Sequence, residues 1–279
     1  MTVHPAALGA AEYRGSRKII DREAAMGTVA GKVIAVTGAS SGSGVGIARR
    51  FVEGGATVVM LARGKERLER AAEDLGERAV PVPVDVGDPD SVRRAFDLVS
   101  SRFGQLDVLI NNAAVYRPCA VEQLSDPDIA GQIATNFAGP VYTSRAAIPL
   151  LRAAGGGDII NTSSESTLHP FPMLSMYVAT KAALEAFGRV LTMEVAKDDI
   201  RVTTVIQGTA REAGMGSDDW QWDPEHAQAA YELWQEMGLL STAIGRYGGQ
   251  DVDDIGDVHV FIVTRPRAQK MDTVFCRSF

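Results

Sequence analysis

Cysteine is scarce in this chain of 279 residues, with Cys119 and Cys276 far apart. Two cysteines cannot build a disulfide scaffold, so we expect a reduced, cytoplasmic protein. No apolar run approaches the ~20 residues that cross a bilayer, and we therefore expect no membrane association. Histidine is also rare, and because the four histidines are scattered we expect no metal site (His4, His169, His226 and His259).

Positive charge is in the minority, since 28 Lys and Arg against 35 Asp and Glu give a net charge of 28 − 35 = −7. This balance argues against a nucleic-acid partner, because phosphate binding normally requires a basic face. Residues 1–30 carry many charges and lack the apolar centre of a signal peptide. With 46 % hydrophobic residues the chain has enough apolar side chain for a core. We expect an N-terminal arm over 1–30 and one domain over 31–279.

Short β-branched runs alternate with longer amphipathic stretches. The expected strands are Val33–Thr37, Thr57–Leu61, Val80–Val84, Val108–Asn111, Asp158–Asn161, Arg201–Ile206 and Thr273–Cys276. Between the first six of these strands, the expected helices are Gly44–Glu53, Lys65–Leu75, Pro89–Arg102, Asn136–Leu151 and Met176–Ala196. Such alternation predicts an α/β fold with a doubly wound parallel sheet and helices on both faces.

The third strand contains two prolines, Pro81 and Pro83, two positions apart. Their missing N–H donors lie on the same side of the strand, which an edge strand tolerates and a central strand does not. In the doubly wound order 3-2-1-4-5-6-7 the third strand is at the edge. The prolines therefore support that order.

Residues 209–250 interrupt the alternation and contain all three tryptophans, Trp220, Trp222 and Trp234. The segment follows the sixth strand, where an insertion can cover a site at the carboxyl ends of the strands. It is either a substrate lid or a packed surface subdomain or subunit contact.

A glycine-rich turn, Thr37-Gly38-Ala39-Ser40-Ser41-Gly42-Ser43-Gly44, joins the first strand to a helix. Glycines there let backbone amides approach a pyrophosphate at the positive end of the helix. A plain strand-to-helix turn would look similar, but the position directly after the first strand favours a dinucleotide. We expect cofactor contacts from Gly38, Ser40, Ser41, Ser43 and Gly44.

The second strand ends in Leu61-Ala62-Arg63. Binding the free ribose hydroxyls of NAD usually requires an acid here, which Ala62 does not supply. Arg63 can pair with the 2′-phosphate of NADP, or it is a solvated surface arginine. Together the two residues favour NADP. Asp85, after the third strand, is either an acceptor for the adenine amino group or a turn or cap residue.

Tyr177 and Lys181 lie four residues apart in a helical pattern and so share a face. An ammonium near a phenol stabilises the phenolate and is expected to lower the tyrosine pKa, which suits proton transfer. Ser164 follows the fifth strand, where its hydroxyl can donate to a substrate carbonyl.

These motifs together resemble those of the short-chain dehydrogenase/reductase family, from about Lys32 to the C-terminus. The glycine turn, the fourth-strand motif Asn111-Asn112-Ala113-Ala114, and Tyr177-x-x-x-Lys181 agree in order and spacing. Ser164 stands 177 − 164 = 13 residues before Tyr177, as the family's catalytic serine does, and Asn136 occupies the place of its fourth catalytic residue.

The resemblance implies a Rossmann-like fold and a mechanism without metal. Tyr177 would be the general acid in reduction, Ser164 would polarise the carbonyl, and Lys181 would hold the nicotinamide ribose. Asn136 would position a water linking Lys181 to solvent. Tyr177 and Lys181 would also contact the cofactor, together with Val86, Asn112, Ala113, Gly208 and Ala210. The family commonly forms tetramers through the Tyr177 helix, so we expect a homo-oligomer, a tetramer or dimer.

The chain departs from the family pattern after the sixth strand, where Gln207-Gly208 replaces Pro-Gly and Glu212 replaces a threonine. We expect an NADP-dependent carbonyl reductase or alcohol dehydrogenase acting on a small ketone, aldehyde or alcohol. A 3-oxoacyl-carrier-protein reductase shares every motif named above and is the first alternative. A non-catalytic dinucleotide-binding regulator is the second, although such proteins typically lose the tyrosine or lysine.

Overall fold

The computed structural model describes residues 27–211, 223–240, 245 and 248–278. It contains a parallel sheet of seven strands in the order β3-β2-β1-β4-β5-β6-β7, which confirms the predicted fold and strand order. The strands are β1 (Val33–Thr37), β2 (Thr57–Ala62), β3 (Ala79–Pro83), β4 (Val108–Asn111), β5 (Gly157–Ser164), β6 (Ile200–Gln207) and β7 (Thr273–Cys276). Pro81 and Pro83 lie in the edge strand β3, as predicted.

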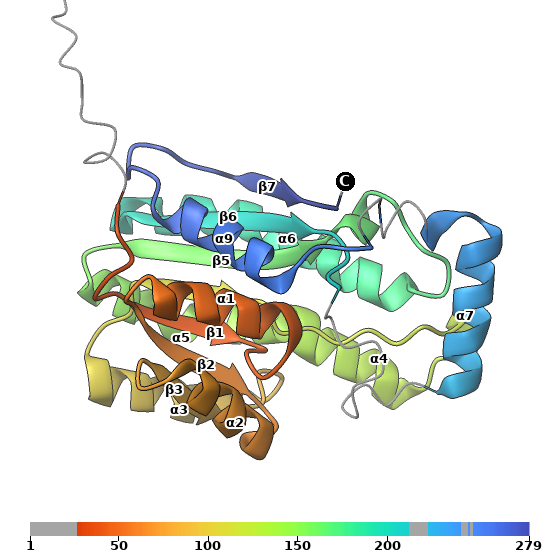
Figure 1. Ribbon diagram of the computed structural model, residues 1–279, viewed down its shortest axis with the longest axis horizontal. Coiled ribbons are helices and arrows are strands. Elements are labelled where there is room, and N and C mark those ends of the chain that lie inside the picture. The colour runs from red at the N-terminus through yellow and green to blue at the C-terminus, as the bar shows by residue number, and fades with distance from the viewer. Residues whose placement is uncertain (1–26, 212–222, 241–244, 246–247, 279) are drawn as a thin grey trace, which may run out of the picture.

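Helices cover both faces of the sheet (Figure 1). They are α1 (Gly42–Glu53), α2 (Lys65–Leu75), α3 (Pro89–Phe103), α4 (Asp126–Ile133), α5 (Gly139–Ala153), α6 (Ser175–Val195), α7 (Pro224–Glu236) and α9 (Val252–Val263). Alternate strand residues point to opposite faces, so the core has two layers. Ile34 and Val36 of β1 belong to the layer under α1, α2 and α9, whereas Ala35 belongs to the layer under α3, α5 and α6.

The predicted helix over Asn136–Leu151 is wrong at its start. Helix α4 begins at Asp126, after the Ser125 side chain accepts a hydrogen bond from the backbone N–H of Asp128. It continues through a π-helical turn, Ala134–Ala138, directly into α5. Asn136 therefore lies inside a helical segment rather than at the beginning of one.

A buried ion pair joins β5 and β6 at the end of the sheet opposite their carboxyl ends. Asp158 and Arg201 are direct partners in the parallel register, and Arg201 Nε lies 2.7 Å from Asp158 Oδ1. Arg201 Nη1 also donates to the carbonyls of Arg265, Pro266 and Gln269. One guanidinium thus fixes both the strand pair and the chain between α9 and β7.

The expected N-terminal arm lies largely outside the described residues. At the first of the described residues, the N–H of Gly27 donates to the carbonyl of Thr264, and Val29 is buried in the core. Among the described residues, no helix has the length and apolar character that spanning a membrane requires.

Candidate active site

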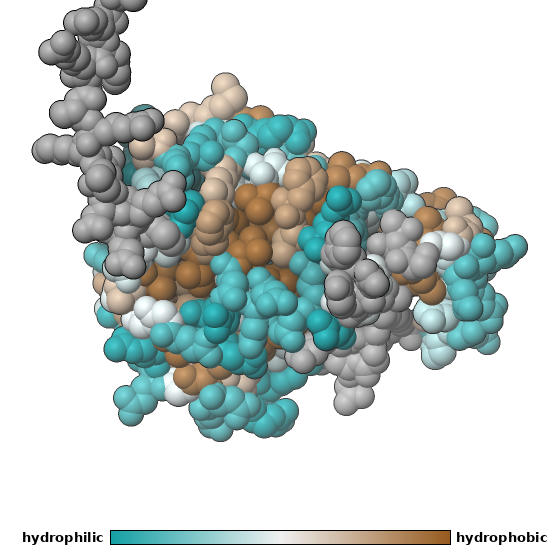
Figure 2. Space-filling model, turned by 45° about the horizontal axis from the view of Figure 1, so that its top comes forward, coloured by the Kyte–Doolittle hydropathy of each residue, from teal (hydrophilic) through white to brown (hydrophobic). Residues whose placement is uncertain are grey.

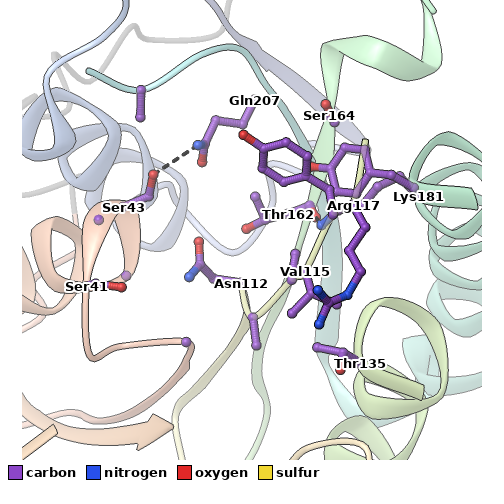
Figure 3. A pocket seen from close by; sticks show the side chains of 18 of the residues that line it. Ser41, Ser43, Asn112, Val115, Arg117, Thr135, Thr162, Ser164, Lys181 and Gln207 are labelled. Carbon is purple, nitrogen blue, oxygen red and sulfur yellow. Dashed lines mark hydrogen bonds between the residues drawn. The ribbon is translucent and has the colours of Figure 1, made fainter. Parts of the chain in front are cut away.

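One cavity of about 450 Å³ lies at the carboxyl ends of the strands. Figure 3 shows Ser41 and Ser43 of the glycine turn on one side of it and Arg117 and Thr135 on the other. Most of the predicted site residues line it: Gly38, Ser40, Ser41, Ser43, Gly44, Arg63, Asp85, Val86, Asn112, Ala113, Ser164, Tyr177, Lys181, Gly208 and Ala210. The sequence therefore pointed to residues from seven separate segments that the fold brings to one cavity.

The glycine turn requires glycine at two of its positions. Gly38 has φ +70°, and a Cβ on Gly44 would lie 2.1 Å from the Gly38 carbonyl oxygen. The Thr37 hydroxyl accepts hydrogen bonds from the backbone N–H groups of Asn112 and Ala113, at 2.9 and 3.0 Å. The ends of β1 and β4 are thereby held together, and the close backbone approach fits a dinucleotide pyrophosphate.

A second arginine, not predicted from the sequence, stands beside Arg63. Arg67 lies in the first turn of α2, four residues after Arg63, and lines the same cavity. Its Nη2 donates to the Ser40 hydroxyl at 3.1 Å. Burial lowers the pKa of Arg67, and nearby Arg70 and Arg63 lower it further. Arg63 precedes α2, so helical spacing does not relate the two arginines, and no local pattern singled out Arg67.

Asp85 and Val86 follow the edge strand β3. The Asp85 carboxylate accepts a hydrogen bond from the backbone N–H of Gly87 at 2.9 Å. Asp85 therefore stabilises the turn, which is one of the two roles expected for it. Both residues line the cavity, and Val86 is buried.

The three polar groups of the predicted chemical centre converge from β5 and α6. Ser164 is the last residue of β5, and its side chain is hydrogen-bonded to Tyr177. One helical turn beyond Tyr177, Lys181 is 2 % exposed, and its Nζ donates to the Thr162 carbonyl at 2.6 Å. The Lys181 Nζ lies 5.7 Å from the centroid of the Tyr177 ring.

Burial dominates the acid–base properties of this centre. It raises the pKa of Tyr177, an effect that the hydrogen bond with Ser164 opposes. It lowers the pKa of Lys181 to about 8, while Glu185 acts in the opposite direction. The net shift of the Tyr177 pKa is upward because desolvation penalises a buried phenolate, and the lowering expected from Lys181 together with the charged nicotinamide stays a prediction.

Asn136 is fully buried in the π-helical turn behind the cavity and does not line it. Its side chain accepts from the N–H of Val115 and donates to the Val115 carbonyl, both at 2.7 Å. It also donates to the Thr180 hydroxyl at 3.2 Å. Asn136 thus connects the loop after β4 with α6, and its proposed water contact stays a prediction.

Gln207, which departs from the family pattern, also lines the cavity. Gln207 Nε2 donates to the Ser43 hydroxyl at 3.0 Å (Figure 3), which joins the end of β6 to the glycine turn. Glu165, which the sequence analysis did not single out, lines the cavity directly after Ser164. Glu212, the other departure, lies outside the described residues.

Part of the predicted insertion over 209–250 is described, although Trp220 and Trp222 are not. Helix α7 carries Tyr231 and Trp234 to the lining of the cavity. The Trp234 indole N–H donates to the carbonyl of Pro172 at 2.8 Å. The segment therefore forms part of the pocket wall, and its closing over a substrate remains a prediction.

A doubly wound sheet with a glycine turn and a cavity at its carboxyl edge defines the Rossmann-like class of α/β domains. The family model for short chain dehydrogenases matches residues 32–223 of this chain. The chain belongs to the short-chain dehydrogenase/reductase family, and it is an oxidoreductase of that family.

Two similar curated proteins are named as an oxidoreductase and a dehydrogenase. The chain is 33 % identical to oxidoreductase BOA17 of Botryotinia fuckeliana over 223 residues, covering 79 % of each. It is 40 % identical to 11-beta-hydroxysteroid dehydrogenase 1A of Arabidopsis thaliana over 183 residues. That match covers 64 % of this chain and 52 % of the plant protein.

Solved structures match nearly the whole chain. L-sorbose reductase from Gluconobacter frateurii, solved with NADPH and L-sorbose, has a TM-score of 0.76 and 30 % identity, over 91 % of this chain and 97 % of that one. A 3-ketoacyl-(acyl-carrier-protein) reductase from Brucella melitensis, solved with NADH, also has a TM-score of 0.76, at 26 % identity. The second match covers 90 % of this chain and 98 % of the other.

Proposed function

We propose that the protein is an NADP-dependent carbonyl reductase, or an alcohol dehydrogenase in the reverse direction, acting on a small ketone or aldehyde. The observation that carries this proposal is the convergence of Ser164, Tyr177 and Lys181 in the cavity that the glycine turn also lines. When bound, the nicotinamide supplies or accepts the hydride at the carbonyl carbon.

In the proposed reduction, the Ser164 and Tyr177 hydroxyls hold the substrate carbonyl oxygen. Tyr177 donates the proton to that oxygen as negative charge develops on it. Its raised pKa keeps the phenol protonated before the reaction. Lys181 binds the nicotinamide ribose and stabilises the tyrosinate that the proton transfer leaves.

The cofactor preference is proposed from the adenosine end of the cavity. Ala62 supplies neither the carboxylate that binds a free ribose nor the repulsion that it would exert on a 2′-phosphate. Arg63 is exposed at the cavity. Arg67 lies close to it and donates a hydrogen bond to the Ser40 hydroxyl. The similar L-sorbose reductase was solved with NADPH, which supports the same choice here.

The function is tested by measuring oxidation of NADPH and of NADH, side by side, against diverse ketones and aldehydes. Arg63 alone predicts a roughly 10- to 100-fold preference for NADPH, as expected for a charge-assisted hydrogen bond. The double variant Ala62→Asp with Arg63→Ile should move the preference toward NADH. Equal use of both cofactors by the unaltered protein would overturn the assignment.

The second candidate function is 3-oxoacyl-carrier-protein reduction, favoured by the structural match to the Brucella protein of that name. It predicts activity on an acyl-carrier thioester that exceeds activity on free ketones. A non-catalytic regulator is less well supported, because all four predicted catalytic positions are filled by the expected residue types.

We further propose a cytoplasmic homo-oligomer whose domain spans 31–279. Small and apolar side chains are exposed along α6, at Ala179, Ala182, Ala186, Val190 and Met193. A second apolar band covers the side where β7 and α9 lie (Figure 2), and Phe261 and Phe275 are exposed in those elements. Light scattering on the purified protein measures the assembly. A monomer would contradict the proposal.

A further inference from the structure

The wall of the cavity beside Tyr177 is apolar and largely aromatic. Leu174 and Trp234 are buried there, and Tyr116 and Phe171 pack against the same cluster. The rings of Phe171 and Trp234 meet edge to face at 5.4 Å. Because the Trp234 indole N–H is already bonded to the carbonyl of Pro172, this wall offers a ligand mainly carbon surface. Such a wall suits a ring-sized apolar group.

An acidic side chain also lines this cavity. Glu165 follows Ser164 directly and is partly buried at the cavity. Its carboxyl group lies over the Cα of Gly208, where a Cβ would meet the two carboxylate oxygens at 3.1 and 3.2 Å. Glycine at position 208 therefore leaves the space that this carboxyl group occupies.

Glu165 is oriented by the chain but keeps further capacity to accept hydrogen bonds. The backbone N–H of Thr209 donates to it, and Arg277 and His169 exert a weaker electrostatic attraction. A carboxylate has about four lone-pair sites, so one backbone donor does not exhaust it. Burial raises the pKa of Glu165, as expected for a carboxyl group held at a water-poor surface. The cation Arg117, which also lines the cavity, is ion-paired with Asp128 at 2.8 Å.

We propose that the substrate is an α-hydroxy ketone with an apolar ring on the other side of its carbonyl group, and that Glu165 accepts the hydrogen bond of its hydroxyl. The proposal rests on the proposed reductase function and deepens it. Ser164 and Glu165 line the same cavity, so the carbonyl oxygen would engage Ser164 and the hydroxyl on the neighbouring carbon would engage Glu165. The ring then packs against Phe171 and Trp234.

The test compares two ketones that differ by one hydroxyl, 2-hydroxyacetophenone and acetophenone. With NADPH, kcat/KM of the unaltered protein should favour the hydroxylated ketone by about 10- to 100-fold, since its hydroxyl donates to a charged acceptor. Glu165→Leu should abolish this preference. Glu165→Gln keeps a carbonyl acceptor for both Thr209 and the substrate, and should retain part of it. Glu122→Leu, at an exposed acid of the chain, is the matched control and should leave the preference unchanged.

The ring subsite is tested with hydroxyacetone, which replaces the phenyl group by a methyl group. Phe171→Ala should reduce kcat/KM for 2-hydroxyacetophenone by roughly 10-fold or more relative to hydroxyacetone. Glu165→Leu should not change that ratio. A ratio unaffected by Phe171→Ala would overturn the ring subsite.

Binding provides a readout that does not depend on turnover. Calorimetry on the protein saturated with NADP⁺ should show tighter binding of 2-hydroxyacetophenone than of acetophenone, and Glu165→Leu should remove the difference. If no ketone is turned over but this binding pattern holds, the reductase function fails and the recognition stands. If turnover occurs but Glu165→Leu keeps the hydroxyl preference, or the unaltered protein has none, the recognition is wrong and the reductase function stands.

Discussion

At the scale of single residues, Tyr177 and Lys181 show how one environment acts oppositely on an acid and a base. Both lie within the same water-poor region of α6, and burial disfavours the charged form of each. The pKa of the tyrosine is consequently raised, and that of the lysine is lowered to about 8. The neutral phenol is the form that the proposed general acid requires at the start of a reduction.

The first prediction concerns Tyr177→Phe. The substitution removes the proton donor but keeps the ring that packs 5.4 Å from Tyr116. Turnover should fall by about 10²-fold or more, the usual contribution of general acid catalysis. The affinity for NADPH, measured by fluorescence titration, should be retained because Lys181 and the glycine turn are unchanged. Near-normal turnover would show that another residue is the acid.

Neighbouring side chains explain which site residues the sequence could identify. Spacing selected Ser164 over Ser163, and the Ser163 hydroxyl does donate to Glu185, at 2.5 Å, while Ser164 contacts Tyr177. Glu165 and Gln207 could not be assigned in the same way. The Glu165 side chain is placed by its contact with Gly208 and the Gln207 side chain by its hydrogen bond to Ser43. No local sequence pattern encodes these tertiary contacts.

At the scale of elements, strands were easier to predict than the helical segment before the active site. β1, β4 and β7 have the predicted bounds, because a β-branched run of fixed period is a local property. The path from α4 into α5 was not predicted, since a π-helical turn interrupts the period on which helix prediction relies. That turn contains Asn136, whose amide must reach Val115 and Thr180.

The start of α2 carries the second prediction. Arg67→Ala should weaken NADPH binding by about 10-fold or more and leave NADH binding nearly unchanged, because only NADPH has the 2′-phosphate. Dissociation constants of both cofactors measure this. Arg93→Ala, at an exposed arginine of α3, is the control and should affect neither. Equal weakening of both cofactors would indicate that Arg67 only supports Ser40.

The third prediction concerns the β5–β6 pair. Arg201→Met leaves the buried Asp158 carboxylate without its 2.7 Å partner, although Arg267 still reaches it at 3.3 Å. Removing one member of a buried ion pair typically costs about 3–5 kcal/mol. Urea unfolding should therefore show a large loss of unfolding free energy for Arg201→Met. The double variant Arg201→Met with Asp158→Leu should recover part of that free energy. A double variant no more stable than Arg201→Met would contradict a stranded charge as the cause.

At the scale of the whole molecule, the two core layers connect distant parts of the chain. Helix α9 packs on α1, where Arg50 donates to Asp257 across the exposed rim of the contact. On the buried side of α9, His259 is fully enclosed. Its Nδ1 lies 2.8 Å from the Ile255 carbonyl. Among the described residues, its Nε2 has no hydrogen-bond partner.

This buried histidine makes stability depend on pH. Desolvation lowers the pKa of His259 to about 4, below the usual value of 6.5. Between these two values the unfolded chain binds a proton that the folded protein does not, so the free energy of unfolding falls as pH falls. The slope from this group is about 1.4 kcal/mol per pH unit, or about 3 kcal/mol in total between pH 6.5 and pH 4. Above pH 6.5 the group contributes no pH dependence.

The fourth prediction follows from that slope. His259→Phe keeps an aromatic ring on the buried side of α9 but cannot bind a proton. The free energy of unfolding of both proteins is measured in urea at intervals from pH 7.5 to pH 4.5. The carboxyl groups titrate in the same way in both proteins, so their contribution cancels in the difference. We expect the unaltered protein to lose stability more steeply below pH 6.5, while the two curves run parallel above it. Curves that stay parallel throughout would show that His259 becomes protonated in the folded protein as readily as in the unfolded chain.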